Sequence, residues 1–339
     1  MNKYLTLATG AAIFVGIPLS AQKSAEEAKT YPAPSEIVAA AKAEEWVAIA
    51  PSDLLVMDLA AVPDGKVLKP RRVVIQLMPP PFSQGWIGNI RKLAAAKFWD
   101  GTSINRVQDN YVTQWGDASE KKALPAGLAV VPESEYVSDS DSFSRIGARL
   151  GPVGRAKTAD EAANEAIAAA AKPKSDGTSS DSYTLFTGNV NGWPLASDGA
   201  GVWPTHCYGM VGVGRNLSPD SGTGAELYTV IGHAPRHLDR NIALVGRVIE
   251  GIEYLSSLPR GTGALGFYEK EEERVPILSV RLGNDAKNMP AFEYLSTESA
   301  SFAAYADARA NRRDPFFIRP AGGADICNIP VPVRRKSVQ

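Results

Sequence analysis

Short runs of aliphatic and aromatic residues, separated by turn-forming Gly, Pro, Asn and Asp, recur along most of this chain. This pattern is typical of β-strands joined by tight turns. It predicts strands over residues 54–59, 72–77, 103–108, 111–116, 183–187, 208–214, 226–232, 243–248 and 275–282. Many short strands with few helices favour an all-β barrel or sandwich over an α/β sheet.

Apolar residues recur at helical spacing in a few segments. Residues 83–97 predict one core helix, for which Ser83 is the expected N-cap. Residues 251–258 predict a second, shorter helix. Near the N-terminus, residues 35–47 predict a further helix, which Ser35 is expected to cap.

The length of 339 residues suggests about two domains, or one domain with large insertions. Residues 119–182 are dense in Ala, Ser, Lys and acidic residues, with too few apolar residues for a large core of their own, so we expect a partly disordered surface insertion. The expected organisation is a signal peptide (1–21), a linker with a helix (22–52), a barrel domain (53–283) that contains the insertion, and a C-terminal extension (284–339).

The N-terminus has the pattern of an export signal. Lys3 supplies a positive charge, residues 5–19 are apolar or small, and Leu19-Ser20-Ala21 precedes the expected cleavage near Ala21. The stretch is shorter than the about 20 residues that a membrane span needs. An uncleaved anchor is the alternative, because leucine is unusual three residues before the cleavage point. We expect a periplasmic or secreted protein that does not associate with the membrane after cleavage.

Composition narrows the function classes. The 36 Lys and Arg residues balance 37 Asp and Glu residues, so no basic field indicates a nucleic-acid partner. Two cysteines exclude a disulfide-stapled scaffold and a four-cysteine zinc site, and three histidines leave little material for a histidine-rich metal centre. Cys207 and Cys327 either form one disulfide in an oxidising compartment or remain free, and the sequence leaves both possibilities open.

One arginine interrupts a predicted strand. Arg106 lies between Ile104 and Val107, and Arg is rarely buried without a partner. Alternation along the strand places Arg106 and Gln108 on one face. From the pattern alone, an ion pair at the rim of the sheet explains Arg106 as well as a functional role does.

Four segments resemble, in family order, the motifs of cyclophilin-type peptidyl-prolyl cis-trans isomerases. The first is the signature segment that contains Phe98-Trp99-Asp100-Gly101-Thr102, Asn105-Arg106-Val107 and Tyr111-Val112-Thr113-Gln114-Trp115-Gly116-Asp117. The others are Gly209-Met210-Val211-Gly212-Val213-Gly214-Arg215, Gly224-Ala225-Glu226-Leu227-Tyr228 and the block from Leu238 to Gly251. The resemblance covers residues 53–118 and 183–283.

The resemblance implies an eight-stranded antiparallel barrel capped by two helices. It also implies an enzyme that isomerises Xaa-Pro bonds in proline-containing polypeptides and needs no cofactor and no metal. Arg106 matches the catalytic arginine, and Gln114 matches the glutamine that binds the substrate backbone and orients it. The remaining matches are substrate-binding positions: Tyr111, Val112, Gly214, Arg215, Glu226, Tyr228, His237 and Leu238. The oligomeric state is unknown, and a monomer is favoured.

Several residues depart from the family pattern. Asn105 and Ile242 replace histidines, Trp115 replaces a glycine, and His237 stands where an aromatic residue is common. Glu226 stands at a position that is often Gln, where an acidic side chain either holds the Arg106 guanidinium or competes with substrate for it. These departures leave an alternative open, a non-catalytic module that binds proline-containing peptides on the same barrel.

Other chemistries have weaker support. A Ser/His/Asp hydrolase would draw on His233, His237 and Asp239, but the chain has no Gly-x-Ser-x-Gly motif. The same two histidines are four residues apart, yet Pro235 between them disfavours the helix that a metal pair would need.

Overall fold

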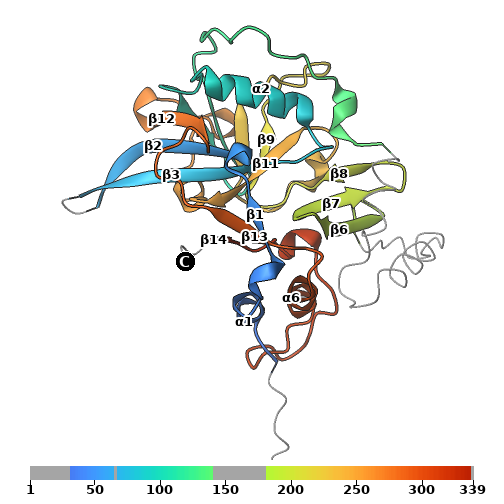
Figure 1. The fold of residues 1–339 in the computed structure, drawn as a ribbon. Coiled ribbons are helices and arrows are strands. Elements are labelled where there is room, and N and C mark those ends of the chain that lie inside the picture. Colours follow the sequence, from blue (N-terminus) through green and yellow to red (C-terminus); the bar gives the residue numbers. More distant parts are fainter. Residues whose placement is uncertain (1–30, 65–66, 140–180, 337–339) are drawn as a thin grey trace, which may run out of the picture.

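The computed structural model describes residues 31–64, 67–139 and 181–336 (Figure 1). The expected signal peptide and its cleavage site lie outside the described residues. So does most of the expected insertion, of which only residues 119–139 and 181–182 are described.

Eight strands form a closed barrel in the order β10-β5-β4-β12-β2-β3-β11-β9, and β9 pairs with β10 to complete it. Every neighbouring pair is antiparallel. The predicted eight-stranded antiparallel barrel is therefore confirmed. The strands are β2 (Leu54–Asp64), β3 (Val67–Leu77), β4 (Ser103–Val107), β5 (Val112–Gly116), β9 (Met210–Val213), β10 (Leu227–Val230), β11 (Leu244–Glu250) and β12 (Val275–Leu282).

Both faces of the barrel wall are buried at β2 and β3. Leu55 and Met57 alternate into the main core, where they are almost fully buried. Leu54 and Val74 point the other way and pack in a separate cluster that contains Phe292 of the C-terminal extension. Each fully buried aliphatic side chain contributes about 1.5–3 kcal/mol relative to an exposed one, so the extension stabilises the barrel from outside.

Two helices cover the barrel, as predicted, and both are shorter than the predicted ranges. Helix α2 (Gln84–Ala95) lies across the strands (Figure 1). Its Trp86 is fully buried. Ser83 takes the N-cap position with a φ of 54°, and its side chain makes no capping hydrogen bond. Helix α5 (Glu253–Ser256) is a single turn whose Leu255 is buried in the main core.

The terminal segments form a small sheet beside the barrel, in the order β1-β13-β14. Its strands are β1 (Trp46–Ile49), β13 (Phe292–Leu295) and β14 (Val333–Arg335), and α1 (Pro34–Ala39) and α6 (Ala300–Ala310) pack together below it (Figure 1). In the part of the chain that the structure describes, no helix is long and apolar enough to cross a membrane.

The predicted helix over residues 35–47 is wrong in its second half. The helix ends at Ala39, and its N-cap is Ala33 rather than Ser35. Trp46 instead begins β1 and pairs with Leu295 of β13. The strand forms because a partner far along the chain supplies its hydrogen bonds and covers the indole, which local helical spacing does not reveal.

A third sheet contains β6 (Phe186–Val190), β7 (Trp193–Ser197) and β8 (Val202–Pro204), in that order. The strand predicted over residues 183–187 therefore begins three residues later. Neither β7 nor β8 was predicted, because Pro, Gly and Ser interrupt their sequence.

The described part of the expected surface insertion is packed against the barrel domain. Val131 and Tyr136 are buried, and the Tyr136 ring stacks on Trp86 of α2 with a centroid distance of 5.3 Å. Residues 119–139 therefore extend the core rather than lying only on the surface.

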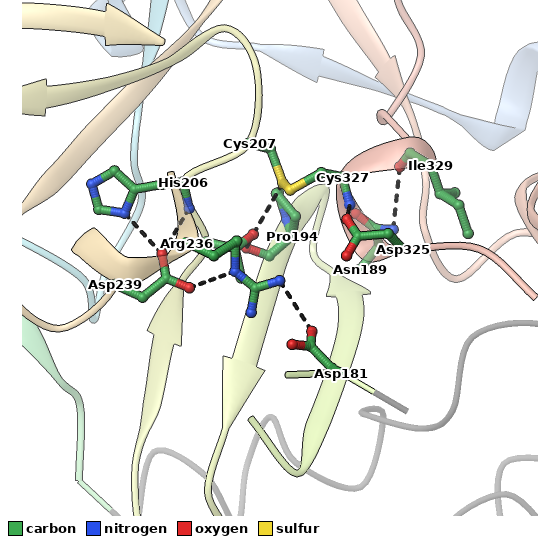
Figure 2. The surroundings of a disulfide bond; sticks show 11 residues. Asp181, Asn189, Pro194, His206, Cys207, Arg236, Asp239, Asp325, Cys327 and Ile329 are labelled. Carbon is green, nitrogen blue, oxygen red and sulfur yellow. Dashed lines mark hydrogen bonds and ion pairs between the residues drawn. A yellow bond between two sulfur atoms is a disulfide. The ribbon is translucent and has the colours of Figure 1, made fainter. Parts of the chain in front are cut away.

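Cys207, before β9, forms a disulfide with Cys327 of the C-terminal extension, which answers the question that the sequence left open. The bond closes a loop with a sequence separation of 120 residues. It fastens the extension to the barrel (Figure 2).

Candidate functional site

Arg106 on β4 is held by three neutral oxygen acceptors. Its Nε–H donates to the carbonyl of Leu265 at 2.7 Å, and one terminal nitrogen donates to Oε1 of Gln114 at 3.0 Å. The other terminal nitrogen donates to Oε1 of Gln108. Among the described residues, no carboxylate forms an ion pair with Arg106. Its positive charge is thus fixed in position without being neutralised.

The register of two strands brings the arginine and Gln114 together. Arg106 on β4 pairs directly with Gln114 on β5, after a bulge between Ile104 and Arg106. Side chains of directly opposed residues on adjacent strands are neighbours, which explains their contact. Partial burial lowers the pKa of Arg106 somewhat, and the guanidinium remains charged at neutral pH.

Two aromatic rings flank the guanidinium. The Arg106 carbon Cζ lies 5.9 Å from the centroid of the Tyr111 ring and 5.4 Å from that of Phe267. The exposed His237 ring stacks on Tyr111 with a centroid distance of 6.4 Å. Phe267 was not predicted, since it lies in a loop segment that carries no family motif. The two rings favour a cation at this position.

An apolar wall lies next to Arg106. Val112, Tyr228 and Val230 form a buried cluster against which Tyr111 and Ile242 pack. The structure therefore gathers three of the predicted wall residues and adds Ile242 to them. Leu238, also predicted for this wall, lies at the end of a 3₁₀ turn (Arg236–Leu238) and is partly exposed.

Gly214 and Arg215 follow β9, at the edge expected to lie along a bound peptide. The Gly214 N–H donates to the Glu226 carbonyl at 2.8 Å, and a Cβ on Gly214 would lie 2.9 Å from Cβ of Glu226. The Arg215 guanidinium donates to the carbonyls of Asn241 and Asn216. Gly214 is needed for this close approach, and Arg215 borders the site from the adjoining loop.

Glu226 touches the arginine only through Gln114. The Gln114 Nε2–H donates to Oε2 of Glu226 at 3.4 Å, while Oε1 of the same amide accepts from Arg106. Of the two roles considered for Glu226, direct contact with the guanidinium is not found among the described residues, because the carboxyl group reaches Arg106 through the Gln114 amide. Burial raises the pKa of Glu226 to about 7, and the hydrogen bond from Gln114 opposes that rise. The carboxylate orients the amide so that its oxygen faces Arg106.

A buried polar chain, which was not predicted, supports Tyr228 from behind. The Tyr228 hydroxyl lies 2.9 Å from Nε2 of His206, whose Nδ1 lies 2.8 Å from Oδ1 of Asp239. Arg236 donates to Oδ2 of Asp239 at 2.6 Å and to Asp181 at 3.0 Å (Figure 2). Burial lowers the pKa of His206, so the ring is neutral, donates to Asp239 and accepts from Tyr228. This series of hydrogen bonds holds the Tyr228 side chain in position.

The same contacts argue against the hydrolase. Asp239 pairs with His206 rather than with His233 or His237, so the three residues of the considered hydrolase are not assembled. Within the described ranges, no group of three or more His, Cys, Asp or Glu side chains is placed to bind a metal ion.

Comparison with known proteins identifies the family. The model of the cyclophilin type peptidyl-prolyl cis-trans isomerase/CLD family matches residues 85–282. The chain belongs to this family. The resemblance read from the sequence motifs is therefore confirmed, and so is the assignment to the peptidyl-prolyl cis-trans isomerases.

One solved cyclophilin structure agrees with the fold. The cyclophilin AquaCyp293 from Hirschia baltica superposes with a TM-score of 0.59 at 20% sequence identity, covering 86% of this chain and 95% of that one. A Cryptosporidium parvum cyclophilin type isomerase, solved in the presence of the dipeptide Ala-Pro, matches with a TM-score of 0.34 at 9% identity, covering 67% and 98%. No curated protein matches this chain.

Two departures from the cyclophilin pattern lie in the interior rather than in the site. Trp115 is fully buried in the main barrel core, and Asn105 is buried beside it in the adjacent strand. The Asn105 carbonyl accepts from the Tyr268 N–H at 2.9 Å. The departures that border the cyclophilin pocket are therefore Glu226, His237 and Ile242.

Proposed function

We propose that this cyclophilin accelerates rotation about Xaa-Pro bonds in exported polypeptides, with Arg106 stabilising the twisted amide. One observation carries the proposal: the guanidinium is fixed by three neutral acceptors, beside the wall of Val112 and Tyr228. A charge that is positioned but not neutralised remains available to a substrate. The adjacent apolar surface suits the ring of a proline.

The rotational barrier of the Xaa-Pro bond determines how much transition-state stabilisation the site must supply. Rotation about an Xaa-Pro bond sacrifices amide resonance and costs about 20 kcal/mol, so it takes tens to hundreds of seconds unaided. An acceleration of about a thousandfold requires a reduction of about 4 kcal/mol. A hydrogen bond from a charged donor contributes about 1.5–3 kcal/mol, and the grip of an apolar wall on the proline ring supplies the remainder.

The donor geometry suits a transition state better than a ground state. Arginine has five N–H donors, and the acceptors described for Arg106 use three of them. Among the described residues, no acceptor binds the other two N–H groups, so these remain available to a substrate. When the amide twists, the prolyl nitrogen regains its lone pair and becomes a better acceptor. A donor that binds this nitrogen, or the rotating carbonyl, stabilises the twisted state selectively.

Two observations support the export part of the proposal. The Cys207–Cys327 disulfide is typical of proteins in oxidising compartments. The first residues of the chain have the composition of a signal peptide. We propose a periplasmic or secreted location. Mass spectrometry of the protein purified from the native cell envelope or medium tests it, since we expect the mature chain to begin near residue 22.

The decisive experiment compares wild type, Arg106→Ala and Arg335→Ala in an isomerase assay on an Xaa-Pro peptide. We expect Arg106→Ala to lower kcat/KM by roughly 10- to 150-fold, the equivalent of one charge-assisted hydrogen bond. The control removes a largely exposed arginine on β14 and leaves the rate unchanged. Near-normal activity of Arg106→Ala would refute the mechanism. Peptide binding by wild type without any acceleration would favour the non-catalytic binding module instead.

A further inference from the structure

A cavity of about 320 Å³ lies between the barrel and the C-terminal extension. Its lining comes from β9, β11, α6 and residues 326–333, together with Pro194 and both cysteines of the disulfide. None of these residues belongs to the Arg106 site. The volume falls within the range of about 300–1,000 Å³ that is usual for small-molecule sites.

A buried arginine borders this cavity without an acidic partner. Arg247 is only 8% exposed, and it donates to Oε1 of Gln76 at 3.0 and 2.8 Å and to the Gly192 carbonyl at 2.7 Å. All of these acceptors are neutral. No carboxylate of the described chain forms an ion pair with Arg247. Buried charges are usually paired with an opposite charge, whereas the contacts of this guanidinium satisfy its hydrogen bonds and leave its charge without a counter-ion.

Aromatic contacts compensate for only part of the burial. The Arg247 carbon Cζ lies 4.6 Å from the ring centroid of Trp193 and 5.8 Å from that of Tyr294. Ring faces attract a cation without neutralising it. Burial lowers the pKa of Arg247 to about 10, so the group still carries its charge at neutral pH.

The other lining residues add to the positive potential and supply an apolar wall. Arg309 of α6 also borders the cavity, and its Nε donates to the Asn328 carbonyl at 2.7 Å. Neither Asp nor Glu is among the lining residues of the described cavity. Most of the remaining wall is aliphatic and includes Met210, Ile326 and Val331. Charge complementarity therefore favours an anion with an apolar body.

We propose that this cavity binds an aliphatic carboxylate of about eight carbons, with its carboxylate at Arg247 and its chain against the aliphatic wall. At roughly 30 Å³ for a group the size of a water molecule or a methylene, the cavity holds about ten non-hydrogen atoms. Octanoate has that size. Tyr208, which is 50% exposed, also borders the cavity.

The disulfide gives the site its shape. Cys207 and Cys327 both line the cavity, and residues from 326 to 333 form one of its walls. The disulfide between them joins this wall to the barrel (Figure 2). Because the wall is covalently fixed, the cavity exists before a ligand arrives. A preformed site binds more tightly than one whose wall must be ordered on binding.

Calorimetric titration of the oxidised full chain tests the proposal, with octanoate, octanol, octylammonium and acetate as separate probes. We expect octanoate to bind with a Kd below about 1 mM and at least tenfold more tightly than each of the other probes. Octanol lacks the charge, octylammonium reverses it, and acetate lacks the chain. Equal binding of octanol, or no octanoate binding below about 10 mM, would overturn the proposal.

Variants locate the bound carboxylate. We expect Arg247→Met to weaken octanoate binding at least tenfold, and Arg309→Gln, which leaves the buried barrel contacts intact, to weaken it severalfold. Val331→Phe fills part of the cavity and should abolish binding in a protein that still unfolds cooperatively. Arg106→Ala should bind octanoate as wild type does. Loss of binding in Arg106→Ala alone would place the ligand in the isomerase site and refute the separate cavity site.

Discussion

The stability of this cyclophilin should depend on pH through Glu226. Burial raises the pKa of this carboxyl from 4.5 to about 7 in the folded protein. Between these values the unfolded chain ionises while the folded protein keeps the proton, so the folded state becomes less stable as pH rises. A difference of about 2.5 pKa units corresponds to about 3 kcal/mol at pH 8.

The substitution Glu226→Gln removes the ionisation and keeps an oxygen that accepts from the Gln114 amide. We expect the variant to be about 3 kcal/mol more stable than wild type at pH 8. At pH 4.5 the difference should be below about 1 kcal/mol, because the folded protein keeps the proton and the unfolded chain is only half ionised. Urea unfolding of both proteins at pH 4.5, 6 and 8, followed by tryptophan fluorescence, measures the difference.

A matched control isolates the effect of burial. Glu272 is exposed, and Glu272→Gln should leave the slope of stability against pH unchanged. If Glu226→Gln and wild type show the same slope between pH 4.5 and 7, then the buried carboxyl does not take up the proton and the reasoning is wrong.

Three further predictions concern packing. Cys207→Ser combined with Cys327→Ser should lower the free energy of unfolding by about 2–5 kcal/mol in denaturant titrations. Gly212→Ala places a Cβ within 2.3–2.4 Å of the Tyr228 phenol, so we expect a loss of about 1–3 kcal/mol and a higher KM for Xaa-Pro peptides. Tyr136→Phe removes a buried hydroxyl that lacks a hydrogen-bond partner in the described structure, so its thermal midpoint should equal or exceed that of wild type. A large loss in that variant would show that the hydroxyl is bonded.

The core of the candidate site was predictable because short-range geometry determines it. Arg106 and Gln114 lie on two strands joined by a tight turn, and Gln108 directly follows the first of them, so the register of the hairpin brings the three side chains together. The family motifs pointed to Arg106 and Gln114, but not to Gln108. The strand pattern and the family motifs predict the same contact between Arg106 and Gln114, because the two strands are adjacent in sequence and their pairing involves no distant segment.

Contacts between distant segments were not predictable in the same way. His206 stands in an apolar run, and its partners Asp239 and Tyr228 become apparent only when the strands close the barrel. Trp46 follows a segment with helical spacing of apolar residues, yet it lies in a strand because it pairs with the distant Leu295. Glu226 reaches Arg106 through an intervening amide, which sequence proximity to a motif does not indicate.

Closure of the barrel has a consequence for solubility. Since β9 pairs with β10, no barrel strand offers an open side to another molecule, whereas β1 and β14 are the outer strands of their sheet. On β14, Arg334 and Arg335 pair with Glu293 and Glu250, and charged side chains discourage the addition of foreign strands. Replacing both arginines with valine would create a template for intermolecular association. Because β6 and β8 are likewise the outer strands of the third sheet, resistance to aggregation depends on the edges of the two smaller sheets rather than on the catalytic barrel.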